Sequence, residues 1–516
     1  MANKLKDIFK NMLSVKNADD LISASKHSEL KKTLNVFDLI ILGIGAVVGT
    51  GIFTIVGIAA QGGNGGIAAG PALSISMIIA ALSCIFSALC YSEFASMIPV
   101  AGSAYTYTYA TMGEFMAWMV GWILMLEYAI GNITVASAWT GYFMQFLKGF
   151  DHVLPGWLVN PPIWLVNDYR TALAICDKTG VNPHDTIPYL FDTIPVAINV
   201  PAIFIVLLLT LLLVKGVKES TKVATVMVFI NLFIIMSFIL VGCFYVKPEN
   251  WVPFAPNGFE GIFMGAFIIF FAYIGFDAIS TAAEETKNPQ RDLPIGILGT
   301  LLICTILYVA TALVLTGMVN YQTIDVQAPI ASAMRFVGQN KIAGCISIGA
   351  LAGLTSVLLV YQLGTTRILY AICRDRFLPK GLRRIHRHNR TPYILTWLSA
   401  IVVILGSLVM DLKISAELCN FGTFLSFIIV CAAVLILRKT EPDRPRAFKV
   451  PFVPLFPILG ILTSGGLMLY SFKELKTSSA WFVAWLVGGV LIYVFYGYKQ
   501  KRLEEKRKNF YKNIDK

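Results

Sequence analysis

The 516-residue chain has few charged side chains: only 14% of its residues are Asp, Glu, Lys or Arg, whereas 56% are hydrophobic. Soluble domains rarely have so apolar a composition, so the scarcity of charge excludes an ordinary soluble protein. The first 35 residues are polar and basic, without a short apolar core before a small-residue cleavage site. We therefore expect no cleavable signal peptide.

The chain also lacks the cysteine and histidine patterns that bind metals. Its nine cysteines include no CxxC pair and no Cys/His ligand spacing, and most fall in apolar segments where they are expected to pack. All five histidines lie outside those segments. These absences argue against a disulfide framework, a buried metal site and a histidine proton relay.

Long apolar segments are what the chain has in abundance. A membrane-spanning helix needs about 20 mostly apolar residues. Twelve candidate spans begin near residues 36, 69, 114, 195, 224, 262, 295, 343, 394, 417, 455 and 480. The sequence therefore predicts an all-α polytopic membrane protein with 12 transmembrane helices.

The basic residues indicate the orientation of these spans. With the N-terminus in the cytoplasm, inner segments hold 32 of the 42 Lys and Arg residues, outer loops hold nine, and Arg367 lies within a span. This asymmetry follows the positive-inside rule and places both termini in the cytoplasm. The basic loop 374–390 and the tail 499–516 are expected to contact anionic lipid and not nucleic acid.

The spans divide the chain into four parts: an N-terminal segment (1–35), a core of spans 1–10 (36–437), spans 11–12 with the preceding loop (438–498), and a basic tail (499–516). The longest gap, 144–194, predicts an outer loop or short helices at the membrane interface, where its tryptophans are favourable. The polar segment 98–109 predicts a turn and a short interfacial helix on the inner side.

Glycines interrupt the first predicted span, between Gly43 and Phe53. Irregular backbone survives at membrane depth only beside a water-filled or ligand-filled cavity. Glycine permits such an unwound stretch, and its exposed amides suit an anion. The alternative is a close helix–helix contact, because small residues at this spacing also form packing faces.

Gly275 interrupts the sixth predicted span, and Asp277 follows within it. If spans 1–5 and 6–10 are repeats, the two breaks occupy corresponding places in halves of opposite orientation. Matched interruptions of this kind predict a transporter binding site near the middle of the membrane.

Several longer motifs resemble the amino acid–polyamine–organocation superfamily, and within it the cationic amino acid transporter branch. They are GAVVGTGIF (45–53), YSEFASMIPVAGSAYTY (91–107), LEY (126–128), AEETKNPQRDLP (283–294), and TRILYAICRDRFLP (366–379) followed by Thr391-Pro392. The resemblance implies the five-plus-five inverted-repeat, leucine-transporter-type fold with helices 1 and 6 broken, and transport of amino acids. Spans 11 and 12 contain no such motif and resemble the family only in that two further spans are present.

The resemblance also implies where an amino acid would bind. The amides of Gly49, Thr50 and Gly51 would hold the carboxylate, aided by the positive end of the following half-helix. The ammonium would meet freed carbonyl groups at the two breaks, which belong to Val47, Phe271, Ala272 and Ile274.

Side chains around these groups would set selectivity. Tyr273 and Phe276 are expected to be gates or pocket walls, with ordinary packing as the alternative. Leu354, by resemblance, faces the substrate side chain, where a bulky apolar residue favours small or medium neutral amino acids.

The polar residues within the spans are compatible with more than one energy source for transport. Many members of the branch carry a lysine in span 5, where this chain has Asn231, which has no proton to lose. Three outcomes remain: uncoupled exchange, sodium coupling, or proton coupling. Sodium would use Thr355 or Ser356 with span 1 carbonyls, and a proton would use Glu127 or Asp277. Glu127 has a structural alternative and Asp277 an alternative role as a helix cap.

We therefore expect a secondary active transporter that moves neutral amino acids across the plasma membrane of a bacterium by alternating access, as a symporter. An exchanger, a carrier of cationic amino acids and a transporter-like sensor are the alternatives. No enzyme activity and no cofactor are expected, apart from a coupling ion, H⁺ or Na⁺. Charged residues near the inner helix ends are expected to form an inner gate, namely Glu93, Glu284, Glu285, Arg291 and Arg367.

Overall fold

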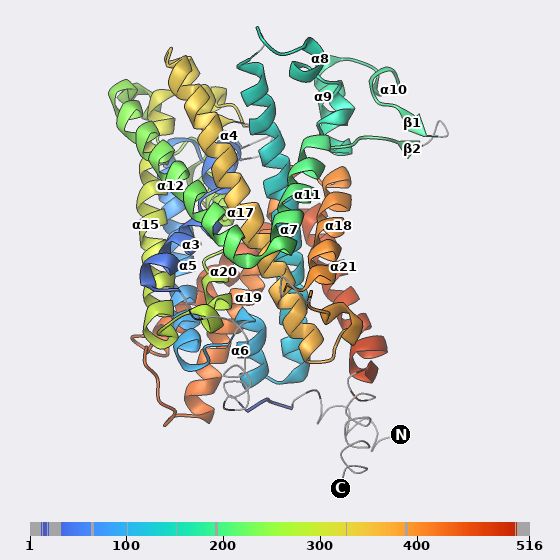
Figure 1. Cartoon of the computed structure of the whole chain (residues 1–516). Helices are drawn as coiled ribbons and strands as arrows, with labels where there is room; N and C mark the ends of the chain where they lie inside the picture. Colours follow the sequence, from blue (N-terminus) through green and yellow to red (C-terminus); the bar gives the residue numbers. More distant parts are fainter. Residues whose placement is uncertain are drawn as a thin grey trace.

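The computed structural model shows a bundle of long helices that run side by side (Figure 1). It describes residues 12, 14–17, 19, 32, 34–62, 67–100, 102–150, 152–190, 194–326, 328–386, 391–500 and 502. Within these residues only two short strands interrupt the helical architecture, so the predicted all-α class is confirmed.

Ten helices form the body of the bundle together with the two broken segments described below. They are α5 (Leu73–Met97), α7 (Glu114–Lys148), α11 (Val200–Lys215), α12 (Val217–Gly242), α15 (Pro289–Met318), α17 (Asn340–Arg374), α18 (Tyr393–Val409), α19 (Leu412–Thr440), α20 (Leu455–Glu474) and α21 (Lys476–Ile492).

The two broken segments consist of shorter pieces. The first contains α3 (Val36–Val47), η1 (Gly51–Ile55) and α4 (Val56–Gln61), and the second contains α13 (Gly258–Phe270), η6 (Phe271–Tyr273) and α14 (Ala278–Thr281).

The remaining elements lie in the connections or directly extend one of these helices. These are η2 (Gly70–Ala72), α6 (Ser103–Thr111), α8 (Gly156–Val159), η3 (Ile163–Leu165), α9 (Tyr169–Thr179), α10 (Pro183–Thr186), β1 (Tyr189–Leu190), β2 (Ile194–Pro195), η4 (Cys243–Tyr245), η5 (Pro248–Trp251), η7 (Ala283–Glu285), η8 (Tyr321–Thr323), α16 (Pro329–Phe336), η9 (Lys380–Arg383) and η10 (Tyr493–Gly497).

Length and composition support membrane insertion. Among the described residues, nine helices are long and apolar enough to span a bilayer, or ten if the bent pair Val36–Val47 and Gly51–Gln61 is one span. Two shorter apolar helices, α11 and α18, lie where two further spans are expected. Large apolar side chains on the outside of the bundle are exposed, such as Phe204, Phe233 and Leu469, as a lipid-facing surface requires.

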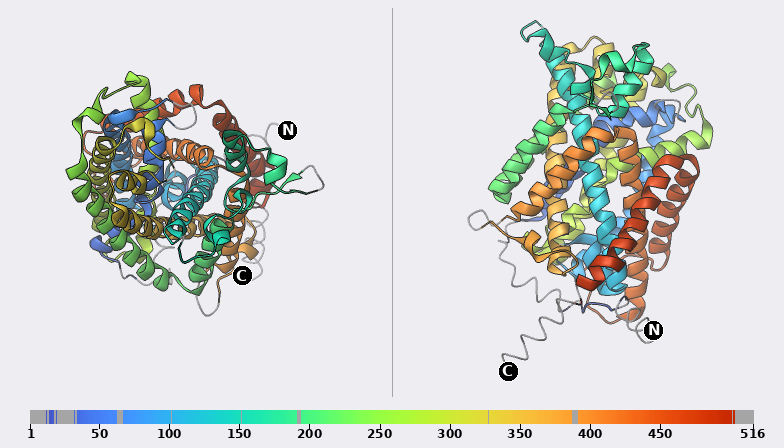
Figure 2. Two further views of the ribbon diagram at one scale, coloured as in Figure 1. Left: turned by 90° about the horizontal axis from the view of Figure 1, so that it is seen from above. Right: turned by 90° about the vertical axis from the view of Figure 1, so that its right-hand side faces the viewer.

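The core lies around α7 and α17, which pack along each other, and α19 also packs on α7. Seen from above, the other helices surround α7, which is drawn in cyan (Figure 2). In the most apolar stretch of α7, 83% of the helix is buried inside the bundle. Polar side chains on α7 are therefore shielded from lipid.

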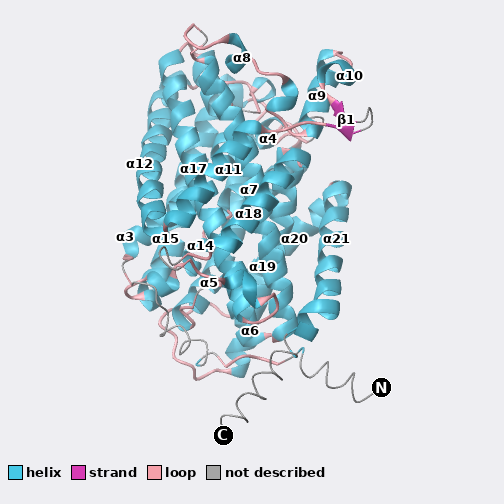
Figure 3. Cartoon of the chain, turned by 45° about the vertical axis from the view of Figure 1, so that its right-hand side comes forward, coloured by secondary structure: helices cyan, strands magenta, loops and turns pink. Residues whose placement is uncertain are grey.

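Short outer elements follow α7. They include α8, α9, α10 and the antiparallel pair β1–β2, which project from one end of the bundle (Figure 3). Ala172, Cys176 and Ile187 form a small core of their own there. The short helices predicted for 144–194 are therefore present.

The predicted helix near residues 98–109 is also present, as α6. Its side chains from Ser103 to Ala110 are buried, against α7, α19 and α14. The expectation of a helix lying on the membrane interface was wrong, because this segment is enclosed by the bundle.

Candidate binding site at the two helix breaks

The first break is shorter than its glycines suggested. The helix α3 ends at Val47, Val48 is extended (φ −84°, ψ 93°), and a π-helical turn, η1, begins at Gly51. The two halves are bent by 40°. Gly43 and Gly45 lie within α3, where an added Cβ would lie 2.3 Å from Thr300 Oγ1 and 2.6 Å from Val228 Cγ2, respectively. These two glycines permit close helix packing, whereas Gly49 and Gly51 belong to the break.

The second break is built around Gly275. The helix α13 ends at Phe270, one 3₁₀ turn follows, and α14 begins at Ala278. Gly275 has φ +112°, a conformation that other residues rarely adopt, and an added Cβ would lie 3.0 Å from the carbonyl oxygen of Ala46. The predicted interruption is therefore confirmed, and it requires glycine.

The two breaks lie against each other. A Cβ added to Gly51 would lie 2.2 Å from Cβ and 2.3 Å from Cα of Ala272. Gly275 packs on Ala46 in the same way. Two irregular segments that are more than 220 residues apart in the sequence thus meet in the core of the bundle. The first amides of η1 have no acceptor within their helix, which leaves an anion-binding end at this point of contact.

Neighbouring tyrosines already occupy the carbonyl groups at the breaks. The hydroxyl of Tyr308, on α15, lies 2.8 Å from the carbonyl oxygens of both Val47 and Ala272. Tyr361, on α17, donates to Ile274 across 3.1 Å. The carbonyl of Phe271 accepts the amide of Ile274 at 3.3 Å. These carbonyls therefore already accept one hydrogen bond each, and each oxygen keeps a second lone pair for an ammonium.

Uncharged side chains also donate hydrogen bonds to backbone carbonyls at and just before the first break. Asn231 donates its side-chain amide to Val48 across 2.8 Å, and Ser356 donates to Gly45 across 2.9 Å. Thr355 donates instead to Leu351 within its own helix and accepts from the indole of Trp139. Ser356 therefore contacts the first broken segment, whereas Thr355 does so neither as a donor nor as an acceptor in these hydrogen bonds. Among the described residues, no three His, Cys, Asp or Glu side chains lie close enough together to bind a metal ion.

Two acids lie in the same region, both almost fully buried. Asp277 accepts the hydroxyl of Tyr128 at 2.8 Å and that of Ser103 at 3.5 Å. Its side chain makes no cap hydrogen bond to α14, in contrast to the capping alternative. Neither carboxyl oxygen of Glu127, nor Oδ1 of Asp277, has a hydrogen-bond partner among the described residues.

Apolar and aromatic side chains close the site. Leu354 is fully buried, and Tyr273 packs edge-on against Tyr308 with 5.2 Å between ring centres. The hydroxyl of Tyr273 donates to Met77 across 3.2 Å. Phe276 packs on Tyr91 and Phe427, with ring centres 5.9 and 5.2 Å away. Tyr273 and Phe276, at the second break, therefore pack against neighbouring aromatic rings.

An ion pair joins helix ends on the side of the bundle that is predicted to face the cytoplasm. Arg367 on α17 donates to Glu285 across 2.6 Å, close to Thr281 of α14. Leu34, just before α3, pairs its backbone with Glu285 and Lys287. A cavity of about 50 Å³ lies above this closure, between α3, α12 and α17.

Glu93 is not part of this inner closure. It is buried and binds Arg438 at 2.7 Å and Arg446 at 3.1 Å, which ties α5 to the last turn of α19 and to the loop that follows it. The expectation that Glu93 belongs to one cluster with the other inner charges was therefore wrong. Its two arginine partners lie 345 and 353 positions after it in the sequence.

Comparison with known proteins agrees with this arrangement. Residues 34–495 match the model of a family described as amino acid permease. The branched-chain amino acid permease BcaP of Bacillus subtilis is 43% identical over 95% of this chain and 98% of its own length. The methylthioribose transporter of Bacillus subtilis is 41% identical over 95% and 98%. The chloroplastic cationic amino acid transporter 9 of Arabidopsis thaliana is 36% identical over 81% and 69%.

Proposed function

We propose, from the premise that this chain belongs to the amino acid permease family, that it transports small or medium neutral amino acids across the plasma membrane of a bacterium. The family consists of membrane transporters and not of enzymes. The observation that carries the proposal is the contact between the two helix breaks at Gly51 and Ala272, which brings helix-end amides and carbonyl oxygens together inside an apolar enclosure.

The architecture behind this proposal is twelve spans with both termini in the cytoplasm, arranged as two inverted repeats of five followed by two more helices. Its support is the set of spanning helices together with α11 and α18, and the corresponding positions of the two breaks in the first and sixth segments. Alternating access would then open the outer and inner closures in turn around a fixed site.

The substrate class follows from what surrounds the breaks. An amino acid presents a carboxylate, for which the amides of Gly49, Thr50 and Gly51 are the donors, and an ammonium, for which the carbonyls of Val47, Phe271, Ala272 and Ile274 are the acceptors. Leu354 offers apolar contact to the side chain. A branched aliphatic side chain suits such a wall, and two of the similar relatives are named branched-chain amino acid permeases.

We propose proton symport as the driving force. Asn231, Ser356 and Tyr308 are uncharged donors to carbonyls of the first break, so a sodium ion would have to share these oxygens with three hydrogen bonds. Glu127 and Asp277 are buried acids with unpartnered oxygens, and a carboxyl group in that position is more stable when it holds a proton than when ionised. Uncoupled exchange is the alternative.

Methylthioribose is a second candidate substrate, because a relative 41% identical to this chain is named for it. A thiosugar has hydroxyl groups but neither an ammonium nor a carboxylate, so it would not use the helix-end amides in the same way. The helix-end amides and carbonyls suit a carboxylate and an ammonium, and they therefore favour the amino acid.

Proteoliposomes that contain the purified chain test these proposals. We expect labelled leucine to accumulate under an inward proton gradient and not under a sodium gradient, with valine and isoleucine as the best competitors. Best competition by arginine or by methylthioribose would overturn the neutral amino acid. Accumulation that requires amino acid inside the vesicles would indicate exchange, and binding without any movement of label would indicate a sensor.

A further inference from the structure

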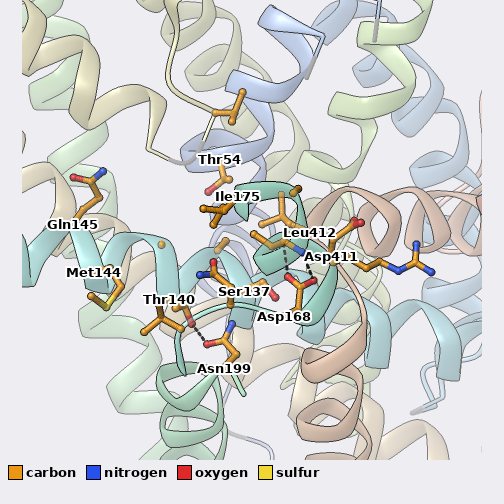
Figure 4. Close-up of a pocket in the computed structure, with 18 of the residues that line it drawn as sticks. Thr54, Ser137, Thr140, Met144, Gln145, Asp168, Ile175, Asn199, Asp411 and Leu412 are labelled. Carbon is orange, nitrogen blue, oxygen red and sulfur yellow. Dashed lines mark hydrogen bonds between the residues drawn. The ribbon is translucent and has the colours of Figure 1, made fainter. Parts of the chain in front are cut away.

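The two sides of the helix breaks differ in how water reaches them. On the outer side, a cavity of about 510 Å³ lies between α7, η1, α9 and the start of α19, and Thr54 of η1 belongs to its lining (Figure 4). On the inner side, the cavity beside the ion pair of Arg367 and Glu285 measures only about 50 Å³. A proton can thus approach the breaks from outside through water, whereas its exit to the cytoplasm has to pass through more closely packed protein.

The short helix α6 lies on the inner side of the second break and is rich in hydroxyl groups. Its sequence from Ser103 to Thr111 is SAYTYTYAT, in which every residue except the two alanines carries a hydroxyl. The side chains from Ser103 to Ala110 are buried, against α7, α19 and α14. A helix enclosed by other helices can be packed with apolar side chains alone, and buried polar groups are unfavourable unless they are bonded. The composition of α6 therefore indicates a polar role inside the bundle.

This helix contacts one carboxyl group in the core and another near the inner end of the bundle. Ser103 lies 3.5 Å from Oδ2 of Asp277, at the second break. Two residues further along α6, Tyr105 donates to Asp375 across 2.7 Å. Asp375 directly follows α17 and pairs with Lys16, which is partly exposed. Less than one turn of α6 therefore joins the buried acid to an acid that is close to solvent.

Unpartnered oxygen atoms gather beside α6. The hydroxyls of Tyr91 and Tyr107 are fully buried, and neither has a hydrogen-bond partner among the described residues. Ser280 lies near the hydroxyl of Tyr107 but donates to the carbonyl of Asp277 across 2.6 Å. The hydroxyl of Tyr91 lies within electrostatic reach of Asp277, Glu127 and Tyr107. Both carboxyl oxygens of Glu127 and Oδ1 of Asp277 are also unpartnered, so five such atoms belong to one neighbourhood.

Internal water is the ligand that this group of atoms fits. Buried polar oxygens are costly when they are left unbonded, and a buried water forms hydrogen bonds to several such atoms at once. Hydroxyl groups both donate and accept, so they can continue a chain of hydrogen bonds through water. The rings of Tyr91 and Tyr107 meet edge to face, with centres 6.3 Å apart. Phe94 stacks on Tyr107 and Phe276 packs on Tyr91, which encloses the group with aromatic surface.

We propose that Tyr91, Tyr107 and the water between them form the inner proton path of this transporter, from Glu127 to Asp375. The carboxyl group of Glu127 releases a proton to this water. The proton then moves along the hydroxyls as O–H bonds and hydrogen bonds exchange, and it enters bulk water beside Asp375. Glu127 stays a carboxylate until the next proton arrives from outside.

The proposal deepens the proposed proton symport and rests on it. Glu127 remains the group that carries the proton, whereas Tyr91 and Tyr107 are positioning residues that hold the water along its route. Asp277 keeps the hydroxyls of Ser103 and Tyr128 in place beside the path, which the side chain of an asparagine can also do.

Accumulation and exchange in proteoliposomes separate the path from the substrate site. Under an inward proton gradient, Tyr107→Phe should slow accumulation of labelled leucine about tenfold, because the ring remains but the hydroxyl is gone. Exchange of leucine for leucine moves no net proton and should stay close to that of the wild type. Tyr493→Phe is the matched control, because it also removes a buried hydroxyl, one that is bonded to Glu114. It should resemble the wild type in both assays.

Two results of these assays have different meanings. Accumulation by Tyr107→Phe at the wild-type rate, or an equal loss of accumulation and exchange, would overturn the path and leave proton symport standing. No accumulation by the wild type under the proton gradient would overturn proton symport, and the path with it.

Radiolytic labelling of the full chain tests for the water itself. An X-ray pulse splits bound water into hydroxyl radicals, which oxidise the side chains beside it even where bulk solvent has no access. We expect Tyr91 and Tyr107 to be labelled about fivefold faster than Tyr308, which is equally buried but whose hydroxyl lies between two carbonyl oxygens. Equal labelling of the three tyrosines would overturn the water path.

Discussion

Asn231 donates its side-chain amide to the carbonyl oxygen of Val48 across 2.8 Å. This contact joins α12 to the extended residue of the first break. Gly353 of α17 lies against the same amide, since an added Cβ there would be 2.5 Å from Nδ2 of Asn231. A neutral amide, which has no proton to lose, therefore holds a carbonyl group of the break.

The first prediction concerns this amide. Asn231→Leu should remove the donor to Val48 and leave a buried carbonyl unpaired, at a cost of about 1–3 kcal/mol. We expect a lower melting temperature and a loss of leucine binding, because the geometry of the break is no longer fixed. Thermal unfolding in detergent and equilibrium binding measure the two effects.

Asn420→Leu is the matched control for this variant. Asn420 is equally buried and donates to the carbonyl of Phe267 across 2.7 Å, a residue of α13 that precedes the second break. The variant Asn420→Leu should lower the melting temperature to a similar extent but affect leucine binding far less. Equal losses of binding in both variants would show that Asn231 acts through stability alone.

A second prediction concerns the hydroxyl that joins the two breaks. Tyr308→Phe removes the donor shared by Val47 and Ala272 and should weaken leucine binding by about tenfold, which corresponds to about 1.4 kcal/mol. Tyr493→Phe is the control, because Tyr493 is also buried but donates to Glu114, away from the breaks. If Tyr308→Phe bound leucine as tightly as the wild type, the hydroxyl would have no part in shaping the site.

The sequence predicted the breaks but not what surrounds them. Glycines and motifs in the first and sixth spans placed the irregular backbone, because lipid tolerates it only in special settings. The tyrosine hydroxyls at positions 308 and 361 were missed. Helices that are apolar on all sides carry little periodicity to show which face meets a neighbour. The partners of Glu93 were missed for the same reason, since they depend on contacts between distant segments.

A third prediction separates the two buried acids. Under an inward proton gradient, we expect Glu127→Gln to abolish accumulation of leucine but to retain exchange, because an amide cannot carry the proton. Asp277→Asn should retain accumulation, since the hydroxyl of Tyr128 still has an oxygen to bind. Accumulation lost in Asp277→Asn and kept in Glu127→Gln would reverse the assignment. Accumulation kept in both would exclude these acids as proton carriers.

A fourth prediction concerns the inner closure between Arg367 and Glu285. Arg367→Gln and Glu285→Gln should each open the inner path more often, because a partly buried ion pair is lost. A cysteine introduced at Ala224, which lines the small inner cavity, reports the opening. Its modification by an impermeant thiol reagent in inside-out vesicles should be about fivefold faster.

Charge exchange provides the control for this closure. The double variant Arg367→Glu with Glu285→Arg restores a pair of opposite charges and should return the modification rate toward that of the wild type. Cys243 and Cys345, the exposed native cysteines among the described residues, are replaced in all of these proteins. Rates that stay at the wild-type value in the single variants would show that the backbone pairing of Leu34 holds the closure by itself.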